Sequence, residues 1–224
     1  MLNWSKISTV LLDMDGTILD LHFDNYFWLE YFPARYSEKY GISIEKARQK
    51  LHSHYEQLTG TIEWYCLDYW SEFTQMPIPQ IKREIEHLIQ LREDADEFLT
   101  ALKQSGREVI LVTNAHPDAL SLKIERTQLD KYFDVLYSTH EFGVVKESQL
   151  LWKKLQEKQG FDVNKTLFVD DSLPVLKSAK KYGIKHILAV ENPDSKKPAN
   201  SFADFTSISD YRELTKDILD NPIK

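Results

Sequence analysis

Two acidic residues follow directly on an apolar run near the start of the chain. The segment reads Thr9-Val10-Leu11-Leu12-Asp13-Met14-Asp15-Gly16-Thr17. An apolar run bounded by a turn signal predicts a buried strand. Carboxylates as close as Asp13 and Asp15 repel each other and resist burial, so their position at a strand end requires a compensating partner. A divalent cation is the simplest such partner.

Polar residues that are able to do chemistry also follow three later apolar runs. They are, in chain order, Thr113, Asn114, Lys146, Asp170 and Asp171. If the sheet is parallel, the carboxyl ends of its strands form one edge, where ligands bind. The two acids of the first motif would meet these residues there. Four carboxylates, a hydroxyl, an amide and an ammonium suit phosphoryl transfer, because carboxylates bind a hard cation and the other groups bind phosphate oxygens.

The elements that must position these side chains alternate along the chain. Strands are predicted at 10–12, 108–112, 135–137, 166–169 and 186–190. Helices are predicted at 148–159, at 173–182, after Asp94 and within 208–224. Asp94 has capping-box spacing to Glu97, and Gly106 ends that helix. Strands that alternate with such helices predict an α/β fold, a doubly wound parallel sheet with helices on both faces.

One interval interrupts the alternation. Between Leu21 and Leu91 no segment predicts a parallel strand, and the interval is rich in aromatic residues. Its apolar positions follow helical spacing, most clearly at Ile44, Ala47, Leu51, Tyr55 and Leu58. About 70 residues is too long for a simple loop. We therefore expect a catalytic core formed by residues 1–20 and 92–224, with residues 21–91 inserted after the first strand as a helical cap.

Composition limits the classes of function. The formal net charge of −7 argues against binding to a nucleic-acid polymer, which requires a basic face. No apolar run approaches the roughly 20 residues that span a bilayer, and no signal peptide is apparent, so we expect no membrane partner and a cytoplasmic location. Cys66 is the only cysteine, so no intramolecular disulfide can form. We interpret Cys66 as a buried apolar residue and His140 as a structural one.

The four motifs, in this order, closely resemble those of the haloacid dehalogenase-like hydrolase superfamily. The resemblance implies that Asp13 is a nucleophile that forms an aspartyl-phosphate and that Asp15 is the general acid–base. It implies Mg²⁺ bound by Asp13, by the backbone carbonyl of Asp15 and by Asp171, with Asp170 in direct or indirect contact. Thr113, Asn114 and Lys146 would bind the phosphate. Asp15 favours phosphate esters, since a dehalogenase attacks carbon and has no leaving alkoxide to protonate.

Several further segments resemble the bacterial GMP/IMP nucleotidase group. They are 19–28, 64–70, 113–117 and 138–140. This resemblance implies a purine 5′-mononucleotidase, and it makes His22, Asn25, Trp28 and His116 candidates for substrate contacts. Three alternatives stay open: a phosphatase of another small metabolite such as a sugar phosphate, phosphotransfer to an acceptor other than water, and a non-catalytic binding module.

Two positions depart from the superfamily pattern. Glu147 follows Lys146 where many members have proline, which would change the stiffness of the loop. Asp170-Asp171 stands where many members have Gly-Asp, so either acid is a candidate for direct contact with the metal.

Overall fold

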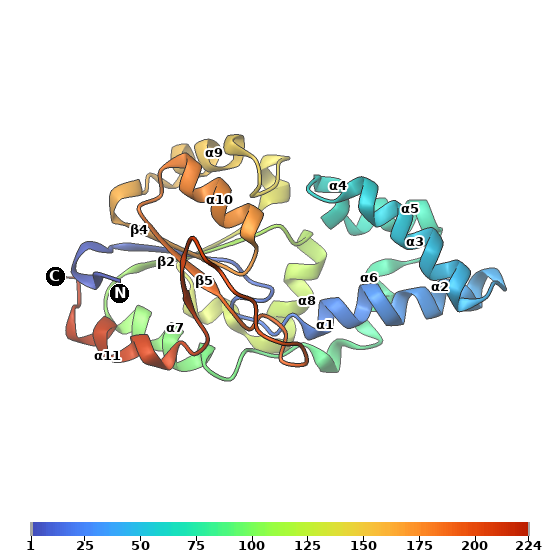
Figure 1. The fold of residues 1–224 in the computed structure, drawn as a ribbon, viewed down its shortest axis with the longest axis horizontal. Helices are drawn as coiled ribbons and strands as arrows, with labels where there is room; N and C mark the ends of the chain where they lie inside the picture. Colours follow the sequence, from blue (N-terminus) through green and yellow to red (C-terminus); the bar gives the residue numbers. More distant parts are fainter. Residues whose placement is uncertain (1, 224) are drawn as a thin grey trace.

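A six-stranded parallel sheet lies between two layers of helices (Figure 1). The computed structural model describes residues 2–223. The strand order is β3-β2-β1-β4-β5-β6, and every neighbouring pair is parallel. The strands are β1 (Thr9–Leu12), β2 (Glu108–Thr113), β3 (Val135–Ser138), β4 (Thr166–Asp170), β5 (His186–Val190) and β6 (Thr206–Ile208). The first five confirm the predicted strands. The sixth was not predicted, because it is a short edge strand in which only Ile208 is buried.

Helices cover both faces of the sheet, which confirms the doubly wound α/β prediction. In Figure 1, α9 (Gln149–Gln159) and α10 (Leu173–Tyr182) lie above the sheet, and α7 (Ala95–Gln104) and α11 (Arg212–Asp220) lie below it. Side chains alternate between the faces of a strand. Accordingly, Val10 and Leu12 join the core on the α7 side, whereas Leu11 joins the core beneath α9 and α10. Helix α8 (Pro117–Thr127) contributes to the α7-side core.

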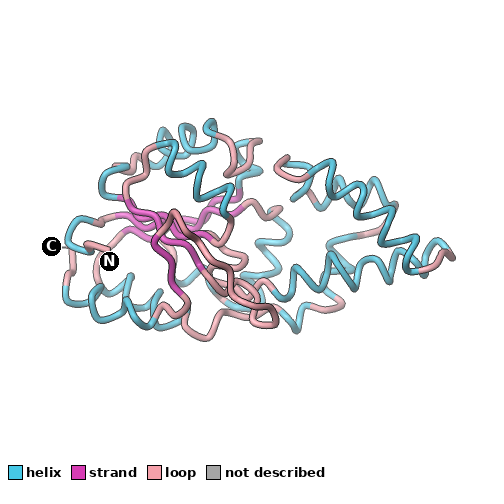
Figure 2. Tube along the Cα trace, in the orientation of Figure 1, coloured by secondary structure: helices cyan, strands magenta, loops and turns pink. Residues whose placement is uncertain are grey.

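Between β1 and α7 the chain is helical and extends away from the sheet (Figures 1 and 2). We call its residues 22–88 the helical insertion. Its helices are α1 (His22–Tyr26), a π-helical turn (Phe27–Tyr31), α2 (Phe32–Tyr40), α3 (Ile44–Leu58), α4 (Ile62–Tyr65), α5 (Leu67–Thr74), α6 (Ile78–Arg83) and a 3₁₀ turn (Glu86–Leu88). The buried face of α3 carries Ala47, Leu51 and Tyr55, three of the predicted apolar positions. Among the described helices, none has the length and apolar character needed to cross a membrane.

Two chain segments connect the insertion to the rest of the molecule, and they run side by side. Leu19 and Leu91 form an isolated antiparallel bridge. The amide of Asp20 donates to the carbonyl of Gln90 at 3.1 Å, and the amide of Arg92 donates to that of Ile18 at 3.0 Å. These two segments lie near the limits predicted for the helical cap, residues 21 and 91, and the division into cap and core stays a prediction.

Short 3₁₀ turns complete the described chain. They are Trp4–Lys6, Leu129–Tyr132, Thr139–Phe142 and Val163–Lys165.

The predicted capping box at the start of α7 is wrong. Asp94 does precede the helix, but its side chain forms no capping hydrogen bond. Its carboxylate instead accepts from the buried guanidinium of Arg92 at 3.1 and 3.2 Å and from the amide of Tyr211 at 2.8 Å. The buried guanidinium of Arg92 would be costly without an anionic partner. Asp94 therefore pairs with Arg92 instead of capping the helix.

Two adjacent leucines of α9 provide a test of the core. Leu151 is fully buried against the sheet, whereas Leu150 is exposed. We expect Leu151→Ala to lower the free energy of unfolding by about 2–5 kcal/mol, because it leaves a cavity. Leu150→Ala should change it by no more than about 0.5 kcal/mol. Urea denaturation measures both values, and equal effects would contradict this packing.

Candidate active site

Three carboxylates meet where β1 and β4 end. The two strands are neighbours, with Leu12 opposite Val169, so Asp13, Asp170 and Asp171 emerge side by side. One oxygen of each lies within 4.8 Å of the others. Burial, together with Asp170 and Asp13, raises the pKa of Asp171 well above its ordinary value. Such a cluster of oxygen ligands is stabilised by a hard divalent cation, and Mg²⁺ fits this donor set.

Gly16 makes room for this cluster. Its φ is +85°, and a Cβ at this position would lie 2.6 Å from Oδ2 of Asp171. Any other residue would therefore displace the carboxylate as well as strain the turn. The side chain of Asp15, predicted to contribute to the metal site through its backbone, lies outside the group of three carboxylates.

Lys146 joins two of the three carboxylates. Its Nζ donates to Oδ2 of Asp170 at 2.8 Å and to Oδ1 of Asp13. All three side chains are buried. Burial raises the pKa of Asp13 to about 6, although Lys146 opposes this shift. Burial alone would lower the pKa of Lys146, but the two carboxylates raise it above its ordinary value, so the ammonium stays charged.

Asp15 faces a second, separate network of charges. Lys123 of α8 donates to Oδ1 of Asp15 at 2.7 Å and to Oδ2 of Asp24 at 2.6 Å. Lys82 of α6 donates to Oδ1 of Asp24 at 2.9 Å. Burial raises the pKa of Asp15 to about 7, with Asp24 and Asp13 adding to the rise and Lys123 opposing it. A carboxyl group with a pKa near neutrality is able to donate and accept a proton in turn.

Sequence reasoning missed Lys82, Lys123 and Asp24. Both lysines are among the most buried side chains of the protein. Lys82 also lies 4.2 Å from the centre of the Phe27 ring, in cation–π contact. The sequence held only a weak sign of these buried lysines. Lys123 lies beside Leu122 on a face of its helix that is otherwise apolar, and a buried lysine there would need an anionic partner.

Asn114 orders the loop that carries Lys146. Its Oδ1 accepts from the amide of Lys146 at 3.0 Å and from the hydroxyl of Thr139 at 3.1 Å. Its Nδ2 donates to Glu147 at 3.1 Å, and Glu147 also accepts from the hydroxyl of Tyr65 in the insertion at 3.3 Å. The glutamate that replaces the usual proline therefore connects the loop to the helical insertion.

Thr113 lies at the end of β2, beside the carboxylate cluster. Its Oγ1 accepts from the amide of Ala115 at 3.0 Å, which leaves the hydroxyl proton available to a ligand. The phosphate contacts of Thr113, Asn114 and Lys146 stay predictions, and all three residues line a cavity over the carboxylates.

A cavity of about 300 Å³ lies over the carboxylates, between the sheet edge and the insertion. Three of the four predicted substrate contacts line it, namely Asn25, Trp28 and His116. Asn25 donates to Asp194 at 2.7 Å, and Nδ1 of His116 accepts from the amide of Asp118 at 3.3 Å, capping α8. His22 is not among the lining residues, and its Nδ1 lies 3.7 Å from Asp194.

The chain is similar to known hydrolases in sequence and in fold. The model of a family described as haloacid dehalogenase-like hydrolase matches residues 7–183. The GMP/IMP nucleotidase YrfG of Escherichia coli (strain K12) is 44% identical over 216 residues, which cover 96% of this chain and 97% of that protein. A crystal structure of a HAD phosphatase from Thermococcus onnurineus has a TM-score of 0.80 at 23% identity, covering 97% of this chain and 100% of that one.

A further solved structure is that of the HAD-hydrolase YfnB from Bacillus subtilis bound to magnesium. It has a TM-score of 0.66 at 20% identity and covers 95% of this chain and 98% of that one. At this level of identity the likeness concerns the fold.

The charge network around Asp15 provides a test. We expect Lys123→Met to lower the free energy of unfolding by roughly 3–5 kcal/mol, because two buried carboxylates lose a shared cation. Lys177→Met on α10 is the matched control, since Lys177 is exposed, and it should change the value by no more than about 0.5 kcal/mol. Urea denaturation at neutral pH measures both variants. Equal free energies of unfolding for the two variants would contradict the pairing of Lys123 with Asp15 and Asp24.

Proposed function

Since this chain belongs to the haloacid dehalogenase-like hydrolases, we propose that it is a Mg²⁺-dependent phosphomonoester hydrolase, with purine 5′-mononucleotides such as GMP and IMP as substrates. One observation carries the proposal: Asp13 and Asp15 end one strand within a single cavity, yet they pair with different lysines. The 44% identical GMP/IMP nucleotidase of Escherichia coli supports the choice of substrate.

In the first step the carboxylate of Asp13 attacks phosphorus. A bond forms between Oδ of Asp13 and phosphorus, the bond from phosphorus to the ester oxygen breaks, and Asp15 gives its proton to the leaving alkoxide. The product is an alcohol, which for a nucleotide is the nucleoside. The pKa of about 7 suits Asp15 to this role, because a substantial fraction of the group carries a proton at neutral pH.

In the second step water attacks the aspartyl-phosphate. Asp15, now a carboxylate, accepts a proton from the water as its oxygen bonds to phosphorus, and the bond to Asp13 breaks. Inorganic phosphate leaves, and both carboxyl groups return to their starting states. Lys146 would stabilise the charge on Asp13 and on the phosphate oxygens, and Thr113 and Asn114 would donate hydrogen bonds to those oxygens.

Asp13, Asp170 and Asp171 would hold Mg²⁺, since they present an oxygen-only donor set. When bound, the ion offsets the repulsion between an anionic nucleophile and an anionic phosphate.

The helical insertion would act as a cap that excludes water during the first step. Trp28 and Tyr65 from the insertion line the cavity and offer aromatic surfaces for a base. Asn25 and His116 offer polar atoms for the base or the ribose. The cavity therefore combines a phosphate-binding floor with an aromatic wall, which suits a mononucleotide.

A substrate panel tests the assignment. Phosphate release should require Mg²⁺ and stop when EDTA is added. We expect kcat/KM for GMP and IMP to exceed that for ribose 5-phosphate and glucose 6-phosphate by roughly tenfold or more, because stacking of a base on an aromatic ring is worth about 1–3 kcal/mol. Equal values for nucleotides and sugar phosphates would support a phosphatase of another metabolite. Failure on every ester would leave a binding module.

The nucleophile assignment has its own test. Asp13→Asn should lower kcat roughly a thousandfold or more, because the amide cannot form the covalent intermediate. Its unfolding midpoint should stay at or above that of the native chain, since one of three crowded carboxylates is removed. Asp130→Asn, at an exposed position, is the control and should keep full activity. Near-native turnover by Asp13→Asn would refute the mechanism.

A further inference from the structure

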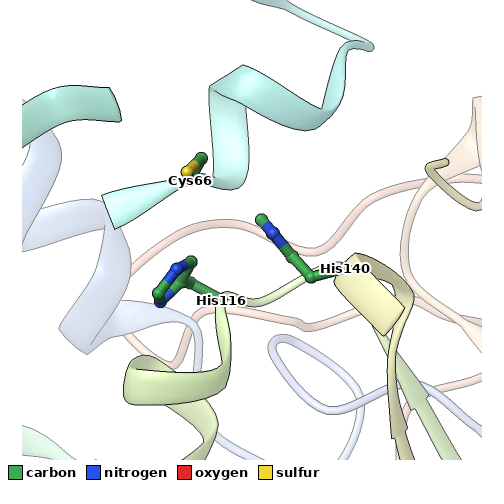
Figure 3. Close-up of side chains that lie close together, drawn as sticks. All are labelled: Cys66, His116 and His140. Atoms are coloured by element: carbon green, nitrogen blue, oxygen red, sulfur yellow. The ribbon is translucent and has the colours of Figure 1, made fainter. Parts of the chain in front are cut away.

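Three metal-ligating side chains meet between the helical insertion and the core (Figure 3). Cys66 lies in the turn between α4 and α5 of the insertion, His116 immediately precedes α8, and His140 lies in the 3₁₀ turn after β3. One ligand atom of each residue lies within 4.8 Å of the other two. The proposed hydrolytic mechanism uses neither Cys66 nor His140.

His140 presents a buried ring nitrogen at this site. Its Nε2 has no hydrogen-bond partner among the described residues. A buried polar atom without a partner is costly, and a metal ion bound at the cluster would provide one.

His116 and Asp68 supply the other side of the site. The rings of His116 and His140 are 5.0 Å apart and nearly perpendicular. Nε2 of His116 lies 3.6 Å from Oδ2 of Asp68, an exposed carboxylate at the start of α5. Ligation through Nε2 requires the ring proton of His116 on Nδ1. The hydrogen bond that Nδ1 accepts from the amide of Asp118 would then give way to a contact with Oδ2 of Asp118, which lies 3.9 Å away.

The donor set selects a different metal from that of the carboxylate cluster. A thiolate, two imidazoles and a carboxylate match the tetrahedral ligands of Zn²⁺, whereas Mg²⁺ prefers oxygen ligands throughout. The two sites would therefore bind different ions because their ligand atoms differ.

We propose that Cys66, His116 and His140, with Asp68 as the fourth ligand, bind Zn²⁺ and thereby hold the helical insertion against the core. Cys66 and Asp68 come from the insertion, and the two histidines come from the core. An ion that binds all four ligands at once stabilises the arrangement in which the two parts are in contact. His116 also lines the cavity, so zinc binding would fix one wall of the substrate site. The zinc site itself does not depend on the proposed substrate.

Cobalt spectroscopy tests the site directly. The chain has a single cysteine, so thiolate-to-cobalt charge transfer in the near ultraviolet reports on Cys66 alone. We expect Co²⁺ added to the protein in excess Mg²⁺ to produce this absorption, and Zn²⁺ to abolish it by competition. Cys66→Ser should lack the band. Absence of the band in the native chain would overturn the proposal.

A pair of histidine variants tests whether the cysteine acts with its neighbours. His140→Gln should weaken Zn²⁺ binding about tenfold or more, as loss of a ligand implies. His186→Gln is the matched control, because Nε2 of His186 is likewise buried without a partner but lies on β5, outside the cluster. Calorimetric titration with Zn²⁺ measures both affinities. Native affinity in His140→Gln would refute the site.

Hydrogen exchange tests the connection between the two parts. Zn²⁺ should slow amide exchange in residues 61–68 of the native chain and leave it unchanged in Cys66→Ser. Equal exchange with and without Zn²⁺ in the native chain would overturn the inference that the ion holds the insertion in place. Neither this measurement nor the cobalt spectrum requires turnover, so both remain informative if the proposed nucleotidase activity fails its own test.

Discussion

The placement of buried carboxylates beside buried lysines is the constraint on which the rest of this structure depends. Parallel strands bring Asp13, Asp170 and Asp171 to one edge, where burial and mutual repulsion both oppose their charges. Lys146 offsets part of this cost through its two carboxylate contacts. A site organised in this way is poised for a divalent cation and an anionic substrate, because its charges are already desolvated and oriented.

The helical insertion completes the site as well as covering it. Lys82 and Asp24 belong to the insertion, yet they form one continuous network with Lys123 and Asp15 of the core. Glu147 adds a second connection, through Tyr65. Movement of the insertion would therefore change the charges around Asp15. If the insertion closes over a substrate as proposed, the same ion pairs would couple that closure to the protonation of Asp15.

Much of the core could be predicted from the sequence. Apolar runs mark its strands, glycine residues mark the ends of its helices, and strands and helices alternate along the chain. The strand-end residues were found for the same reason, since parallel topology brings them together. Lys82 and Lys123 could not be found in this way. Each stands within a helix, where a lysine is usually exposed, and its burial depends on how the insertion packs against α8. The edge strand β6 was missed because Ile208 is its only buried residue.

The two acids of the first motif have different environments because they face different partners. Asp13 shares Lys146 with Asp170, whereas Asp15 shares Lys123 with Asp24. The pKa of Asp13 is raised to about 6 and that of Asp15 to about 7. A cation bound at the carboxylate cluster would lower the pKa of Asp13 and widen the difference from Asp15. The sequence places the two groups side by side, and the fold gives them separate partners, as the proposed roles of nucleophile and proton donor require.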